Sequence, residues 1–368
     1  MKRVEIFSEG YFLSQPDENG AYPRHCQIVR LADDTLIASV GFHLEIGTGR
    51  SYSRIFRSDD RGSSWQDQGP MWDWHSSGKS GRLNVSRTRN GKLLGLGMLW
   101  DTPAAGETYY DRKTGGASHT ELIFSVSDDQ GVSWSPVRSI PMCYPEPPEV
   151  GGVICATRQG DWLAPFAPWL DHTGTNANQG KAAVMISHDQ GESWPDFAEF
   201  MEDPSGKIAY QEVWVEEMAD GGLLGIAYAR DMEAGEDLPV QYSISRDGGK
   251  SFCSNRSTTL IGQTTAVHAL PDGRVACAFN RRYGNPPGVG FATARPDEKG
   301  FHLEFEEILW KAVAGFREED QDTEAMYWAD FAFGEPRIAT FSDGSFFVGF
   351  WCHEKDIHGS RYCHFRLR

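Results

Sequence analysis

Three glutamates precede turns at similar intervals, and their types suit acid–base chemistry. Glu212 and Glu335 each lie nine residues before a turn glycine, and Glu149 lies eleven residues before one. When two carboxyl groups lie close together, one charge raises the pKa of the other, which gives an acid and a base at neutral pH. Most glycoside hydrolases use such a pair to cleave the glycosidic bond. We therefore take all three as catalytic candidates; the alternative is that they are solvated carboxylates or ion-pair partners.

The turns after these glutamates belong to a hairpin phrase that occurs six times. Each copy is a β-rich run, a turn and a second β-rich run, which is a strong hairpin signal. The turn positions are Asp34, Gly91, Gly160, Gly221, Gly273 and Gly344. Helical periodicity is not sustained anywhere. Six all-β units predict a six-bladed β-propeller that forms a single domain over residues 1–368. Residues 3–8 and 361–367 are both strand-like, so we expect the N-terminal strand to complete the last blade.

A second phrase, Ser-x-Asp-x-Gly-x-x-aromatic, follows the first four hairpins. It begins at Ser58, Ser127, Ser187 and Ser245, at intervals of 69, 60 and 58 residues. Its aspartate can accept backbone N–H groups of its own turn, and its glycine permits a positive φ. A motif copied into successive units is expected to be structural, so we do not look for catalysis there.

Composition and net charge argue against several classes of binding partner. The net charge of −17 argues against nucleic acid and against an anionic membrane surface. No apolar run reaches the roughly 18 residues of a membrane span. The first residues, MKRVEIFSEG, contain no apolar signal segment, so we expect a cytoplasmic location. The eleven histidines form no HExxH or other regular metal spacing, and we expect neither metal nor cofactor. The oligomeric state stays open.

The repeated phrases resemble the Asp-boxes, or BNR repeats, of the sialidase superfamily, and the resemblance covers nearly the whole chain. In that family the innermost strand of each blade begins at the central channel, where its residues hold a sugar. The resemblance implies that Arg24 belongs to an arginine cluster and that Glu212 matches a Glu-Pro strand start. Glu335 stands where sialidases carry a nucleophilic tyrosine. The further substrate-binding candidates are Arg82, Arg230, Arg281, Arg337, Glu45 and Trp169.

Departures from the family's pattern indicate different sugar chemistry. Tyrosine tolerates the carboxylate on the anomeric carbon of sialic acid, whereas Glu335 would repel it. The family's catalytic aspartate is missing, and Glu45 lies two residues from its place. We therefore expect an exo-acting glycoside hydrolase for an aldose or uronic-acid glycoside. Glu149 with Glu212 resembles the exo-arabinanase branch. A true sialidase, a polysaccharide lyase and a non-catalytic glycan-binding propeller are the alternatives.

Overall fold

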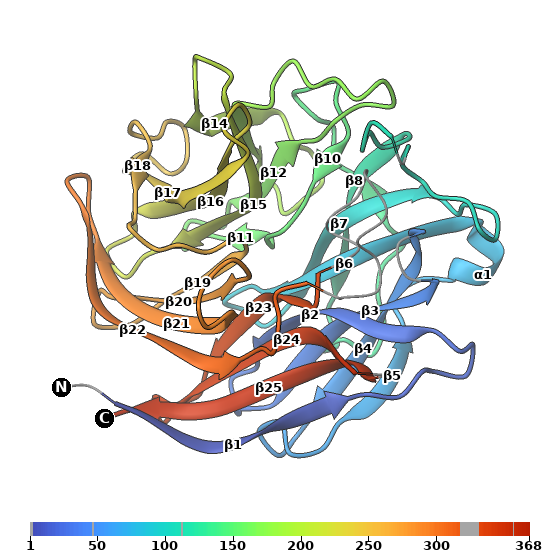
Figure 1. The fold of residues 1–368 in the computed structure, drawn as a ribbon. Coiled ribbons are helices and arrows are strands. Elements are labelled where there is room, and N and C mark those ends of the chain that lie inside the picture. Colours follow the sequence, from blue (N-terminus) through green and yellow to red (C-terminus); the bar gives the residue numbers. More distant parts are fainter. Residues whose placement is uncertain (1–2, 46–47, 112, 317–330, 356) are drawn as a thin grey trace.

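Six antiparallel β-sheets surround a central channel in this chain (Figure 1). The structure is a computed structural model that describes residues 3–45, 48–111, 113–316, 331–355 and 357–368. Within these residues, regular structure is almost entirely β, with one short helix, α1 (Trp74–Ser77). The all-β, six-bladed β-propeller predicted from the sequence is confirmed.

Each blade is a meander of consecutive strands. Blade one contains β2 (Tyr22–Arg30), β3 (Leu36–Glu45), β4 (Arg50–Ser58) and β5 (Gln66–Pro70). Blade two contains β6 (Lys79–Arg87), β7 (Leu93–Asp101), β8 (Thr120–Ser127) and β9 (Arg138–Ser139). Blade three contains β10 (Pro148–Glu149), β11 (Cys155–Ala156), β12 (Trp162–Pro168), β13 (Lys181–Ser187) and β14 (Asp196–Glu202).

The second half of the ring repeats this plan. Blade four contains β15 (Ile208–Glu217), β16 (Leu223–Asp231), β17 (Glu236–Ser245) and β18 (Arg256–Ser257). Blade five contains β19 (Thr265–Ala269), β20 (Val275–Arg281), β21 (Gly288–Pro296) and β22 (Phe301–Lys311). Blade six contains β23 (Phe333–Thr340), β24 (Phe346–Glu354), β25 (Ile357–Leu367) and β1 (Val4–Leu13).

The predicted ring closure is present in blade six. The first strand, β1, pairs with the last, β25, from Val4 opposite Leu367 to Leu13 opposite Ser360. Backbone hydrogen bonds of 2.9 Å join Arg3 and Arg368 in both directions. The two termini therefore lie side by side on the outer edge of the ring (Figure 1).

The repeated Ser-x-Asp-x-Gly phrase connects neighbouring blades. In the first copy the Ser58 hydroxyl donates to Asp60 and accepts from the Gly62 N–H, at 2.8 and 2.7 Å. The other three copies repeat both bonds at 2.8–2.9 Å. Gly62 also touches the preceding blade, because a Cβ there would lie 2.3 Å from Phe347. The phrase acts as an inter-blade contact, which agrees with its expected structural role.

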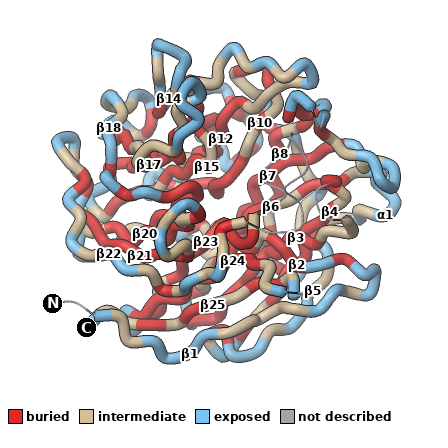
Figure 2. The backbone as a smooth tube through the Cα atoms, viewed as in Figure 1, coloured by how far each residue is buried: buried red, intermediate tan, exposed pale blue. Residues whose placement is uncertain are grey.

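Apolar side chains fill the spaces between sheets. Buried stretches of backbone therefore run through all the blades (Figure 2). Phe291 in blade five, for example, packs 4.9 Å from the rings of both Phe346 and Phe365 in blade six. Such packing buries faces that a single blade would leave in water, and it holds the innermost strands in a fixed ring. That ring positions the residues of the channel.

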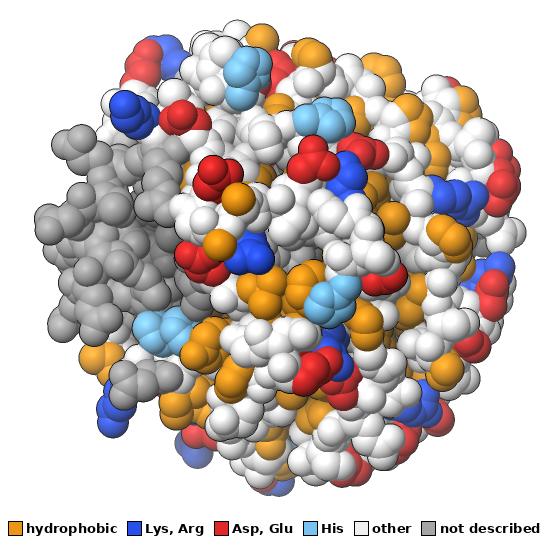
Figure 3. Space-filling view, turned by 90° about the vertical axis from the view of Figure 1, so that its right-hand side faces the viewer, with side chains coloured by type: hydrophobic (Ala, Val, Ile, Leu, Met, Phe, Trp, Pro, Cys, Tyr) orange, Lys and Arg blue, Asp and Glu red, His pale blue; other side chains and the backbone are white. Residues whose placement is uncertain are grey.

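Charged side chains of both signs are interspersed on the face drawn in Figure 3. Among the described residues, no helix is long and apolar enough to cross a membrane.

Candidate active site

One end of the channel opens into a cavity of about 180 Å³. All six innermost strands, or the turn just before them, contribute to its wall: Arg24, Arg82, Glu149, Glu212, Thr264 and Glu335 come from blades one to six in order. Five of these residues were candidates from the sequence, and so was Trp169, which also lines the cavity. The structure thus brings together six of the ten sequence-predicted site residues.

Backbone irregularities aim three of the side chains at the axis. His25, Glu212 and Glu335 have φ values of 55°, 51° and 48°, a region that non-glycine residues seldom occupy. Each lies at a register shift of its innermost strand, in β2, β15 and β23. A β-bulge inserts an extra residue and turns its side chain out of the regular alternation. The same irregularity occurs in three blades, which indicates that the strained backbone serves to direct these side chains toward the channel axis.

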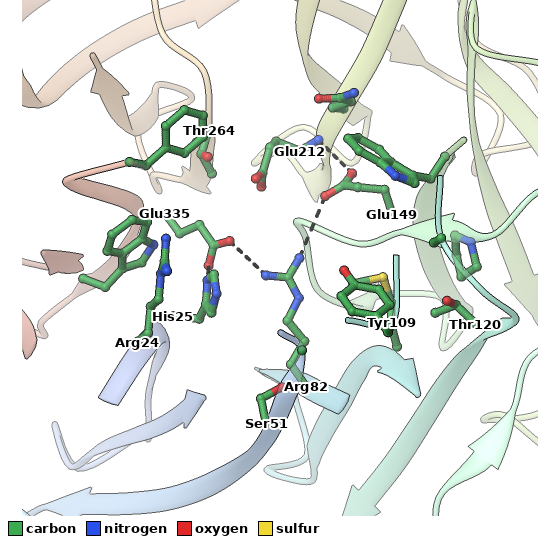
Figure 4. A pocket seen from close by; sticks show the side chains of 18 of the residues that line it. Arg24, His25, Ser51, Arg82, Tyr109, Thr120, Glu149, Glu212, Thr264 and Glu335 are labelled. Atoms are coloured by element: carbon green, nitrogen blue, oxygen red, sulfur yellow. Dashed lines mark hydrogen bonds and ion pairs between the residues drawn. The ribbon is translucent and has the colours of Figure 1, made fainter. Parts of the chain in front are cut away.

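Arg82 lies between two of the glutamates (Figure 4). One of its terminal nitrogens donates to Glu335 Oε1 at 2.9 Å. The other donates to the Val150 carbonyl at 2.9 Å and lies 3.9 Å from Glu149 Oε1. The other oxygen of Glu335 lies 2.5 Å from His25 Nδ1, which donates its proton because a carboxylate can only accept. Both oxygens of Glu335 are therefore occupied.

Glu149 and Glu212 form a second contact. The Glu212 backbone N–H donates to Glu149 Oε2 at 2.9 Å. Glu212 Oε2 is buried and has no hydrogen-bond partner among the residues that the structure describes. The neighbouring Gly151 makes room for it, since a Cβ there would lie 2.5 Å from that oxygen. Glu149 thus accepts a hydrogen bond from its neighbour, while Oε2 of Glu212 is buried without one among the described residues.

The three carboxyl groups differ in their protonation. Burial raises the pKa of Glu149 to about 8, with a further contribution from the charge of Glu212. Burial and the charge of Glu335 raise the pKa of Glu212. Burial would also raise the pKa of Glu335, but His25 and Arg82 outweigh it and hold that pKa well below its usual range. The cavity therefore holds one carboxylate that stays charged, Glu335, and a neighbouring pair, Glu149 and Glu212, whose raised pKa values favour holding a proton.

Burial lowers the pKa of His25 to about 4. The imidazole is neutral near pH 7, so it serves Glu335 as a hydrogen-bond donor rather than as a counter-ion.

Side chains next to the cavity link the blades across and around the channel. Arg337 in blade six is buried and reaches across the axis to the Gly151 carbonyl of blade three, at 2.8 Å. Asn84 in blade two donates to the Gly152 carbonyl at 2.9 Å. The guanidinium of Arg337 also lies 5.6 Å from the centre of the Trp214 ring. Arg337 thus spans the channel from blade six to blade three, next to the residues that line the cavity.

The walls differ in character. On the side of blades two and three the rings of Trp100 and Tyr109 stack at 4.5 Å, and Trp169 is fixed by a 3.0 Å bond from its indole N–H to the Gly115 carbonyl. On the opposite side the guanidinium of Arg24 lies 4.0 Å above the Trp351 ring, and that of Arg282 lies 3.6 Å above Phe331. One wall is suited to the apolar face of a ring, the other to hydroxyl or carboxylate oxygens.

Four candidates lie elsewhere. Arg337 spans the channel, beneath Glu335, instead of lining the cavity. Arg230 is directly opposite Asp237 in the sheet and pairs with it at 2.6 Å. Arg281 lies 3.8 Å from Glu306, and with Arg230 it lines a neighbouring pocket. Glu45 accepts the Gly106 N–H at 3.3 Å, outside the cavity lining.

Sequence reasoning missed His25, His43 and Trp351, which also line the cavity. His25 directly follows Arg24, so strict strand alternation would turn it away from the axis. The bulge between Arg24 and Cys26 removes that alternation. The only sequence signal that could have pointed to His25 is its place directly before a β-rich run.

Within the described residues, no group of three or more histidine, cysteine, aspartate or glutamate side chains could hold a metal ion.

Comparison with known proteins supports the fold over the whole chain. No family model matches the sequence, and no curated protein matches it. A solved protein of unknown function from Dyadobacter fermentans superposes with a TM-score of 0.75 at 17% identity, over 99% of each chain. A Streptococcus pneumoniae sialidase superposes with a TM-score of 0.67 at 11% identity, over 97% of this chain and 70% of that one.

A third solved structure is an α-L-arabinanase from Penicillium chrysogenum in complex with arabinobiose. It superposes with a TM-score of 0.64 at 12% identity, over 98% of each chain. The six-bladed β-propeller of this chain is thus the fold of sialidases and of related propeller glycoside hydrolases.

Proposed function

We propose that this protein is an exo-acting glycoside hydrolase and that Glu149 and Glu212 form its catalytic pair. The observation that carries the proposal is the hydrogen bond from the Glu212 backbone N–H to the Glu149 carboxylate, which places the two acidic residues next to each other in the cavity wall, where burial raises the pKa of both. Two carboxyl groups of which one holds a proton are the ordinary requirement for glycoside hydrolysis.

The hydrogen bonds support distinct roles for the two residues. Donors stabilise a charged carboxylate, and Glu149 faces two of them, the Glu212 N–H and Arg82. Glu212 lines the cavity, and its buried Oε2 has no hydrogen-bond partner among the described residues, so no donor stabilises a charge on that oxygen. The two carboxyl groups titrate as a pair that shares a proton near neutral pH. We place that proton on Glu212, the general acid, in the reactive form, because the donors around Glu149 favour its charged form. Glu149 is then the carboxylate that attacks the anomeric carbon or activates the attacking water.

The reaction balances with these two groups alone. The proton of Glu212 moves to the glycosidic oxygen as the bond from that oxygen to the anomeric carbon breaks. If Glu149 attacks directly, a glycosyl ester forms, and water then cleaves it while returning a proton to Glu212. If Glu149 instead takes a proton from water, hydroxide adds in one step. NMR of the first-formed anomer distinguishes retention from inversion.

The shape of the site supports attack at a chain end. Because Arg337 spans the channel between opposite blades, we do not expect a polysaccharide to thread through it. The stacked aromatic wall and the Arg24 and Arg282 wall suit the two sides of one terminal sugar ring. We assign an aldose or uronic-acid glycoside, since the carboxylate of Glu335 would repel the anomeric carboxylate of sialic acid. The arabinanase neighbour makes arabinofuranosides the first substrates to test.

The test is a panel of aryl glycosides against three forms of the protein. The panel contains an α-L-arabinofuranoside, a β-D-glucuronide, an α-L-rhamnoside and a sialoside; the forms are wild type, Glu212→Gln and Glu216→Gln. Glu216 lies four residues along the same strand, outside the cavity lining, and is the matched control. We expect Glu212→Gln to lower kcat/KM about 100- to 10,000-fold, as loss of a general acid does, and Glu216→Gln to leave it unchanged.

Three outcomes would contradict the proposal. Turnover of the sialoside alone would overturn the substrate class. Wild-type activity in Glu212→Gln would overturn the assignment of the acid. Binding of a glycoside by wild type with no turnover of any would favour a glycan-binding propeller.

A further inference from the structure

The structure assigns Glu335 the role of a positioning residue: we infer that its carboxylate holds Arg82 beside Glu149 and neither attacks the sugar nor transfers a proton. This inference rests on the proposed function. It concerns the position at which the resemblance to sialidases would place the nucleophile.

The first argument is occupancy. A nucleophile needs a lone pair directed at the anomeric carbon, but both oxygens of Glu335 already accept hydrogen bonds. Arg82 occupies Oε1 at 2.9 Å, and His25 occupies Oε2 at 2.5 Å, with an Arg337 nitrogen 4.0 Å from the same oxygen. The Glu335 side chain is only 8% exposed. Little of it is left for a substrate.

The second argument is what Arg82 does with its other nitrogen. That nitrogen donates to the Val150 carbonyl and faces Glu149 Oε1. Glu335 in blade six, Arg82 in blade two and Glu149 in blade three thus form one chain of contacts across the cavity (Figure 4). Removing the charge of Glu335 would leave Arg82 with Glu149 as its only acidic partner within 4 Å among the described residues.

The third argument concerns the groups that face Glu335. Positive or hydrogen-bonding groups come from three strands: Arg24 and His25 from β2, Arg82 from β6, and Arg337 from its own strand β23. His43 of β3 and Arg282, after β20, also line the cavity. The acidic groups that face it are Glu149 of β10 and Glu212 of β15. The charge of Glu335 acts on both of these acids and favours their protonated forms.

A charge-neutral Glu335→Gln variant should therefore change the acid–base balance without removing the reacting groups. It keeps the oxygen that accepts from Arg82, but it no longer helps to keep the proton on Glu212. We expect the alkaline limb of the pH profile of kcat/KM to move to lower pH by about one unit. Because the neutral amide oxygen holds Arg82 less firmly than the carboxylate does, the maximal kcat/KM should also fall, by up to about 100-fold.

The experiment compares Glu335→Gln with Glu149→Gln on an aryl glycoside that wild type turns over, across pH, with and without sodium azide. Azide can replace a missing carboxylate at the anomeric carbon, so it should accelerate Glu149→Gln and yield a glycosyl azide. Glu335→Gln should show the shift to lower pH and no azide acceleration. Glu335→Asp, which keeps the charge, should retain the alkaline limb of wild type.

Azide acceleration of Glu335→Gln, or an unshifted profile, would overturn the inference. If Glu149→Gln has wild-type activity, the proposed catalytic pair fails instead, and the two failures are distinct.

A second measurement does not depend on the variants folding. An epoxyalkyl glycoside of the same sugar should esterify the reacting carboxylate of wild type, and peptide mass spectrometry should find it on Glu149. A label on Glu335 would overturn the inference.

Discussion

Replacing Glu216 by glutamine should make the protein more stable in alkaline solution. Glu216 lies further along β15 than Glu212, outside the cavity lining. Its Oε1 accepts the Ala269 N–H at 2.9 Å and lies 3.6 Å from His268 Nδ1. Burial is the main cause that raises the pKa of this carboxyl from 4.5 to about 7. Glutamine keeps the size and the acceptor but cannot ionise.

The sign follows from proton linkage. The unfolded chain loses this proton near its ordinary pKa, whereas the folded chain keeps it until about pH 7. Wild type therefore loses folding free energy as the pH rises from about 4.5 to about 7, and the loss is constant above that. The rise corresponds to roughly 3 kcal/mol at 1.36 kcal/mol per pH unit. Because 21% of the side chain is exposed, we expect about 2 kcal/mol after screening.

The assay is urea unfolding of wild type and Glu216→Gln at pH 4.5 and pH 8. We expect equal free energies of unfolding at pH 4.5 and a gain of about 2 kcal/mol for the variant at pH 8. Glu217→Gln is the control, because Glu217 accepts the Arg158 N–H at 3.0 Å and its loss should not stabilise the protein. A variant that gains nothing at pH 8, or gains equally at both pH values, would refute the argument.

Two further predictions concern the turns. Gly62→Ala should cost about 2–4 kcal/mol in urea unfolding, because the new Cβ would overlap Phe347 at a φ of 90°. Gly91→Ala, with a φ of 94° and nothing within 4 Å, should cost only about 1 kcal/mol, and equal costs would contradict the packing argument. Asp129→Ala should lower the thermal midpoint by removing the acceptor for Ser127 and for the Ser133 N–H, at a cost near that of a lost helix cap, about 0.5–2 kcal/mol. An unchanged midpoint would show that the phrase does not stabilise its turn.

The fold was largely predictable because the same local signal repeats. Six turns at comparable intervals specify six hairpins, and hairpins are set by neighbouring residues. Closure was predictable because both ends of the chain are strand-like. The three glutamates and Arg24 were identified through the resemblance to sialidases, which implies that each innermost strand begins at the channel and carries its first residues there.

The remaining errors arise where the strands are irregular. Arg337 follows a register shift, so it points beneath Glu335 rather than into the cavity. Arg230 is at the end of a second strand, where its cross-strand neighbour Asp237 captures it. His25 enters the site only because of a bulge. The choice between Glu149 and Glu335 as the partner of Glu212 depends on which acid Arg82 and His25 contact. These contacts join blades that are far apart in the sequence, so the sequence alone could not predict them.

The way the ring is fastened has a consequence for biogenesis. The Tyr11 hydroxyl donates to Glu354 at 2.8 Å, across a sequence separation of 343 residues. During synthesis on the ribosome, β1 emerges early, and its peptide groups have no partner strand until β25 has been made. A waiting edge can pair with the wrong chain, and contacts so distant in sequence form slowly. We expect the pairing of β1 with β25 to limit the yield of native protein. Chaperones should therefore act mainly on blade six before it closes.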